Sequence, residues 1–236
     1  MKRLALSLGA LAAGLAISLF SGQAQAGPVC TGTVLNLGTG IGLPATLSEV
    51  SGGNCVIVGD KEFGSVTVSG AISGTGSAHF TALTLPGDVS VAFDGTVGPN
   101  SSGTISYGVA VVPGLAQGFL IHDLEKDFTL NSTPGGTAAT ATLTGTVTSS
   151  VAGFGTVSLS CLRNVNPSTG TNCPVTTDFS RLVTDINVTQ SITTGANALA
   201  TAITDTISQA VPEPASLGLL GTGLLGLGVL ARRRRR

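Results

Sequence analysis

Few side chains in this chain have the type and spacing to do chemistry. His79 and His122 are its histidines, and neither lies in a Gly-x-Ser-x-Gly or His-Glu-x-x-His motif. His122 stands just before three alternating acids, Asp123, Glu125 and Asp127. Because calcium takes clustered carboxylate oxygens as ligands, these acids are a candidate metal site. The favoured alternative is a solvated acidic surface.

Nucleophilic catalysis needs a serine or cysteine beside an oriented base, and no such set can be recognised in the sequence. We interpret Asp60 and Glu62, which flank Lys61, as charge-balanced surface. His79 lies in an alternating run and is predicted to be an exposed strand position. The sequence therefore predicts a protein that is not an enzyme and needs no cofactor.

The elements that must position these residues are predicted to be strands. Residues 27–210 are rich in Thr, Ser, Val and Gly, contain no Trp, and alternate apolar with polar residues. Candidate strands cover residues 66–69, 89–93, 104–107, 140–147, 155–161, 182–192 and 199–207. Breaks are expected at 85–88, 94–95, 98–100 and 133–136, and residues 122–127 are expected to form a loop or short helical turn. This rhythm predicts one all-β domain, an antiparallel, jelly-roll-like β-sandwich.

The N-terminus has the pattern of a secretory signal peptide. Lys2 and Arg3 precede an apolar stretch at 4–20, and Ala24 and Ala26 fit a cleavage site. We expect a signal helix within residues 1–26 and a mature chain that starts at Gly27. A retained membrane anchor is the alternative.

The C-terminus, residues 211–236, combines three features. Pro212, Glu213 and Pro214 form an exposed stop ahead of an uncharged apolar run at 215–231, and five arginines follow at 232–236. The run has seventeen residues and as a helix would reach roughly 26 Å, close to the thickness of a bilayer core. We expect a transmembrane helix with its arginine tail in the cytoplasm.

This tail resembles the PEP-CTERM sorting signal of Gram-negative bacteria, and an ordinary membrane anchor is the alternative. The resemblance implies that the chain is held transiently in the inner membrane and processed by an exosortase. The body would be periplasmic at first and would then reach the cell envelope or the outside. A tail of this kind also carries the label of an ice-binding protein C-terminal domain, which describes the tail and not what the body binds.

A second resemblance lies nearer the start of the body. Cys55, Gly59-Asp60-Lys61 and Phe63 are similar to an opening found in many secreted proteins with PEP-CTERM tails, although one extra residue separates Cys55 from Gly59. The resemblance implies a β-sandwich body and does not imply an activity.

Cys30, Cys55, Cys161 and Cys173 all lie in the part predicted to be exported, where an oxidising compartment favours disulfides. Three pairings are possible. We favour Cys30–Cys55 and Cys161–Cys173, because each closes a short loop. A zinc site is the less favoured alternative, because the spacings lack a short Cys-x-x-Cys knuckle and no histidine is nearby.

The charge of the body excludes one class of partner. Residues 27–210 hold four basic and eleven acidic residues, a net charge of about −7. Such a body repels phosphate backbones, so no nucleic-acid binding is expected. Together these features predict an exported cell-surface or matrix protein associated with exopolysaccharide or biofilm. The alternative is a carbohydrate- or partner-binding module on the cell surface.

Overall fold

The computed structural model describes residues 30, 32–38, 43–72, 77–82, 88–115, 119–136, 138–165 and 171–210. Within them the chain forms thirteen strands and one short helix, α2 (Leu47–Val50). No helix of the described part is long and apolar enough to cross a membrane. The strands are β1 (Val34–Gly38), β2 (Leu43–Thr46), β3 (Cys55–Val58), β4 (Lys61–Gly70), β5 (Ser77–Ala82), β6 (Val89–Val97), β7 (Ser102–Val111), β8 (Leu120–Ser132), β9 (Ala139–Thr148), β10 (Val157–Val165), β11 (Val175–Val183), β12 (Asp185–Thr194) and β13 (Ala198–Ala210).

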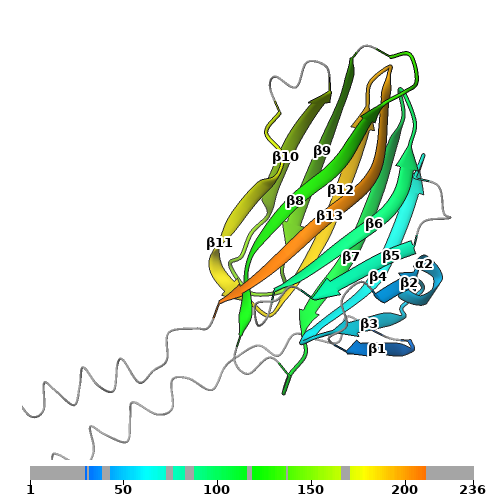
Figure 1. Cartoon of the computed structure of the whole chain (residues 1–236). Helices are drawn as coiled ribbons and strands as arrows, with labels where there is room; N and C mark the ends of the chain where they lie inside the picture. Colours follow the sequence, from blue (N-terminus) through cyan, green and yellow to red (C-terminus); the bar gives the residue numbers. More distant parts are fainter. Residues whose placement is uncertain are drawn as a thin grey trace, which may run out of the picture.

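The strands form two sheets that lie face to face, as Figure 1 shows. Sheet A has seven strands in the order β1-β3-β4-β7-β12-β9-β10, and sheet B has six in the order β11-β8-β13-β6-β5-β2. The pairing of β1 with β3 is parallel, and the other ladders are antiparallel. The all-β prediction is therefore confirmed as a two-sheet sandwich, with one parallel pair that the sequence did not predict.

A single apolar core fills the space between the sheets. In β9, Ala139, Ala141, Leu143 and Val147 are buried while the threonines between them point outward. The inward residues of β6, β8 and β13 supply the facing layer. Period-two alternation produces this arrangement, because successive side chains of a strand leave opposite faces of the sheet.

Three local predictions are wrong. Residues 122–127 are not a loop, because they lie inside β8. The proposed strand at 182–192 is divided at residue 184 between β11 and β12. The expected break at 94–95 lies inside β6, where the pairing register with β13 shifts between Asp94 and Val97. Glycine within a strand often marks such a bulge rather than a turn.

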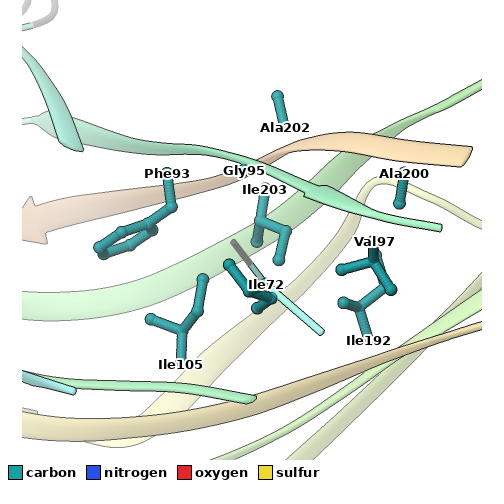
Figure 2. Close-up of a pocket in the computed structure, with 9 residues that line it drawn as sticks. All are labelled: Ile72, Phe93, Gly95, Val97, Ile105, Ile192, Ala200, Ala202 and Ile203. Carbon is teal, nitrogen blue, oxygen red and sulfur yellow. The ribbon is translucent and has the colours of Figure 1, made fainter. Parts of the chain in front are cut away.

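Gly95 also makes room for the residue that fills one end of the core. A Cβ atom at Gly95 would lie 2.8 Å from Ile72, and one at Gly103 of the opposite sheet would lie 2.2 Å from it. Ile72 lies between the sheets, among Ile105 and Ile192 of sheet A and residues of β6 and β13 (Figure 2). The remaining space is about 10 Å³ and almost entirely apolar, the lower limit for one water molecule. It is a packing gap and cannot hold a ligand.

The signal helix, the membrane helix and the Pro212, Glu213 and Pro214 motif lie outside the described residues. The domain boundaries at 26/27 and 210/211 and the jelly-roll-like topology stay predictions. The structure joins Cys30 to Cys55 and Cys161 to Cys173, with Cα–Cα distances of 5.6 and 5.2 Å. This is the pairing favoured from the sequence.

Candidate functional site

The three acids singled out in the sequence point away from the core on β8, but they do not converge. Asp123 lies 3.1 Å from the Nδ1 of His122. Glu125 accepts a hydrogen bond from Thr176 of β11 at 3.1 Å. Asp127 instead forms an ion pair with Arg163 of β10, across the edge of the sandwich. Each acid therefore has its own partner, and they do not form a shared calcium site.

The structure brings together a different set of possible metal ligands. A one-residue register shift against β13 leaves His122 unpaired in that ladder, beside Asp123. The ladder with β11 is also irregular here, between Asp178 and Val183. Asp178 of β11 is directly opposite Asp123, and ligand atoms of the three residues lie within 4.8 Å of one another. Exposed acidic groups often cluster without an ion, so this arrangement alone assigns no metal. His79, on β5, is partly exposed as predicted and lies 3.2 Å from Asp94.

A buried polar cluster, which the sequence analysis missed, ties the two sheets together. Lys126 of β8 lies 3.3 Å from Asp205 of β13 and donates a hydrogen bond of 2.7 Å to Gln190 of β12. Tyr107 of β7 donates a 2.5 Å hydrogen bond to the other carboxylate oxygen of Asp205. A Cβ atom at Gly145 would lie 2.7 Å from the Lys126 side chain, so this glycine leaves the space that the lysine occupies.

The environment of this cluster makes it structural rather than catalytic. Lys126, Asp205, Tyr107 and Gln190 are at most 2% exposed. Burial lowers the pKa of Lys126, and the Asp205 carboxylate partly opposes that change. Burial and the same carboxylate raise the pKa of Tyr107 well above its ordinary value. No substrate can reach these groups, and their role is to pair across the core.

A signal for this cluster was present in the sequence. Lys126 alternates with the apolar residues Leu124 and Phe128, and Asp205 alternates with Ile203 and Ile207. A charged residue in phase with core positions faces the core. Their mutual pairing, however, depends on which strands lie opposite each other.

A second buried cation lies where the body meets the tail. Lys61 is fully buried rather than part of a charge-balanced surface, so that interpretation is wrong. Its Nζ atom lies 2.9 Å from Asp60. Burial lowers the pKa of Lys61, and Asp60 and Asp88 counteract this. Asp60 also accepts a hydrogen bond of 3.0 Å from the side chain of Gln209, near the end of β13. We call Asp60, Lys61, Asp88 and Gln209 the exit cluster.

The outer side of sheet A carries an unbroken field of hydroxyl groups across five neighbouring strands, β4-β7-β12-β9-β10. The ladder registers align two rows of directly paired residues. We call these ten residues the hydroxyl face: Thr67, Ser106, Thr189, Thr146 and Ser158 in one row, and Ser69, Thr104, Ser191, Thr144 and Ser160 in the other.

The geometry of the hydroxyl face follows from the sheet. Neighbouring strands lie about 4.8 Å apart, and alternate residues along a strand lie about 6.7 Å apart. Some hydroxyls bond to each other, as Ser106 does to Thr189 at 3.1 Å. The strands of such a sheet twist by about 20–25° relative to each neighbour. The field is therefore dense and ordered but not planar.

Charge is distributed unequally between the two outer sides. The ten residues of the hydroxyl face are all Ser or Thr and form an uncharged patch, and Glu62 of β4 lies on the same side beyond the end of the two rows. On sheet B, by contrast, Asp94, Asp123, Glu125, Asp127 and Asp178 lie on the outward side of β6, β8 and β11. The hydroxyl face is thus a neutral patch on sheet A, whereas the outer side of sheet B is acidic.

Comparisons with known proteins concern the tail more than the body. Residues 210–236 match the PEP-CTERM protein-sorting motif. The recognition of this tail from Pro212, Glu213, Pro214 and the residues after them is confirmed, and the motif implies export and processing by an exosortase. The match describes sorting and does not extend to ice binding. No curated protein matches the chain.

Solved structures with a similar arrangement include several carbohydrate-binding modules. TmCBM61, in complex with β-1,4-galactotriose, is 13% identical, covers 62% of this chain and 88% of its own, and has a TM-score of 0.33. The C-terminal family 22 module of Clostridium thermocellum Xyn10B is 13% identical over 74% of this chain and 96% of its own, with a TM-score of 0.22. These TM-scores are too low to support any inference about the function of this chain.

Proposed function

We propose that this protein is a non-enzymatic component of the cell surface or extracellular matrix that associates with exopolysaccharide through the hydroxyl face. The signal peptide directs the chain across the inner membrane, the tail holds it there until it is processed, and the disulfide-linked sandwich acts outside the cytoplasm, in the periplasm first. The observation that supports association with polysaccharide is the uncharged array of Ser and Thr hydroxyls across five strands.

The chemistry of that array suits a neutral polymer of hydroxyl groups. Each Ser or Thr hydroxyl donates one hydrogen bond and accepts others, as sugar hydroxyls do. A single such bond is worth only about 0.5–1.5 kcal/mol after exchange with water. Binding therefore requires many simultaneous contacts, and a long chain is favoured over a short oligosaccharide. The twist of the sheet also favours a flexible chain over a rigid planar lattice such as ice.

The described polar groups support a non-enzymatic role. The strongly perturbed ones, Lys126 and Tyr107, are buried in the core and cannot meet a substrate. The exposed acids of β8 are divided among separate partners.

Cell fractionation tests the sorting part of the proposal. Cells with and without the exosortase are compared for the mass and location of the chain. We expect a shorter product in the envelope or medium only where the exosortase is present. The same mass and location in both strains would contradict this part of the proposal.

Sedimentation with purified exopolysaccharide from the same cells tests the surface. The full-length chain is kept in a detergent without a sugar headgroup, so that the detergent does not compete. Thr144, Thr146 and Thr189 are replaced by Val, which keeps the side-chain shape and removes three hydroxyls. We expect affinity to fall about tenfold or more, because three hydrogen bonds are lost.

The matched control replaces Thr129 and Thr204 by Val on the outer side of sheet B, and it should bind as the wild type does. Equal binding by the control and the hydroxyl-face variant would refute the assignment of the surface. If the wild type binds no polysaccharide but captures a defined envelope protein, the alternative of a partner-binding module is supported instead. Slowed ice growth by the wild type, lost in the hydroxyl-face variant, would also overturn the proposal.

A further inference from the structure

The last strand of the body passes directly into the sorting signal. β13 ends at Ala210, and the match to the sorting motif begins at residue 210. The way in which the end of β13 is held therefore determines where the body stops and the tail starts.

The sheet alone holds this end weakly. The ladder between β13 and β6 ends at the pair of Ile207 with Val89. On the other side, the ladder between β13 and β8 shifts register between Ser208 and Gln209, so that only Gln209 and Ala210 follow the shift. The final residues of β13 are thus no longer paired with β6, and their pairing with β8 follows a bulge.

Two carboxylates replace the missing neighbour. Asp88, just ahead of β6, accepts a 3.2 Å hydrogen bond from the backbone N–H of Gln209. Asp60, in the turn between β3 and β4, accepts a 3.0 Å hydrogen bond from the Gln209 side-chain amide. Gln209 is thereby attached to both sheets of the sandwich, through its main chain and its side chain.

The position of Asp60 is itself fixed. Its carboxylate pairs with the fully buried Lys61, and its backbone carbonyl accepts a 2.8 Å hydrogen bond from Val112. A buried cation strongly favours keeping its partner in place, because an unpaired buried charge is costly. Asp60 is a rigid attachment point for Gln209.

We propose that Asp60 and Asp88 are positioning residues for processing of the tail. By holding Gln209 they fix the point at which the chain leaves the body. This sets a constant spacing between the folded sandwich and the motif at Pro212, Glu213 and Pro214 that the exosortase receives. The inference rests on the sorting motif and is independent of any binding to polysaccharide.

The test uses the full-length chain, produced in cells that contain the exosortase for the processing assay and in detergent for hydrogen exchange. The double variant Asp88→Ala/Gln209→Ala removes both attachments and leaves the Lys61–Asp60 pair intact, so the body still folds. We expect amide exchange at residues 208–210 to accelerate about tenfold or more, because the bond to Asp88 is lost. We expect processing to become slower or to give ragged ends, read as intact mass.

Two further variants separate positioning from a general loss of stability. Asp88→Asn, with Gln209 unchanged, keeps an oxygen acceptor for the Gln209 N–H. Both the exchange rate and the processing should therefore stay close to those of the wild type. Asp94→Ala, on the strand β6 that follows Asp88, is the control and should change neither readout. Unchanged exchange at residues 208–210 in the double variant would overturn the attachment, and faster exchange with unchanged processing would overturn the positioning role. Neither result depends on polysaccharide binding, so failure here and failure of the proposed function are distinguishable.

Discussion

Replacing Asp205 by Leu gives a strong test of how the core is held together. The substitution keeps the number and branching of the side-chain heavy atoms but leaves Lys126 almost fully buried without its carboxylate partner. It also removes the acceptor of the Tyr107 hydroxyl and leaves that group unsatisfied. The same contacts join β8 and β13 of one sheet to β7 of the other.

The magnitude follows from the burial of the pair. Removing one partner of a buried ion pair costs about 3–5 kcal/mol. For a body of this size about 1 kcal/mol corresponds to 2–4 °C, so the midpoint of thermal unfolding should fall by about 6–20 °C. The double variant Lys126→Met/Asp205→Leu should be more stable than the single one, because no buried charge remains unpaired. The double variant also removes the Lys126 group that donates a hydrogen bond to Gln190, so its stability should not return fully to that of the wild type.

The assay is urea unfolding followed by far-ultraviolet circular dichroism, since the chain has no Trp and one Tyr for fluorescence. Thr204→Val on the adjacent outward position is the control for a substitution in β13. A cost below about 1 kcal/mol for the Asp205 variant, far less than the penalty for an unpaired buried charge, would refute the reasoning. A double variant no more stable than the single would do the same.

Three further predictions concern other features of the core. Replacing Cys161 and Cys173 by Ser should cost about 3 kcal/mol, because the bridge closes a short loop; urea unfolding under non-reducing conditions measures it, and equal midpoints would contradict it. Stability should fall as pH rises above about 10, because Tyr107 ionises at its ordinary pKa only when unfolded. Tyr107→Phe should make this loss of stability with rising pH less steep. Lys126 has the opposite effect on stability, but both proteins contain it. Equal slopes of stability against pH in the wild type and the variant would exclude the explanation. Ile72→Ala should cost about 2–5 kcal/mol and Gly103→Ala about 1–3 kcal/mol. The double variant should lose less stability than the sum of the two single losses, because Ala at position 72 leaves room for the methyl group added at position 103. Strictly additive losses would show that the two positions do not interact.

Three predictions failed for reasons that the local sequence does not contain. Asp94-Gly95 reads as a turn in the sequence, yet Gly95 lies inside β6 because Ile72 packs against it from the end of the core. Residues 122–127 read as irregular because a one-residue bulge at His122 interrupts their alternation, although the strand continues. Lys61 reads as surface because its neighbours are acidic. Gly95 and His122 are placed by partners distant in sequence, Ile72 and β13, and the burial of Lys61 is not visible in its local sequence.

The sequence by itself determined the sheet-forming character of the body and the sorting signal of the chain, and it favoured the pairing of the cysteines that the structure shows. Alternation of apolar and polar residues, a motif contiguous at the C-terminus and short cysteine spacings are all local signals. Only the tertiary structure decided which strands are neighbours. It thereby assembled the hydroxyl face from strands as far apart in sequence as β4 and β12, and paired Lys126 with Asp205 in the core. The physical reason is that a period of two assigns each residue to a face of its own strand, whereas register and strand order are set by packing between segments far apart in the chain.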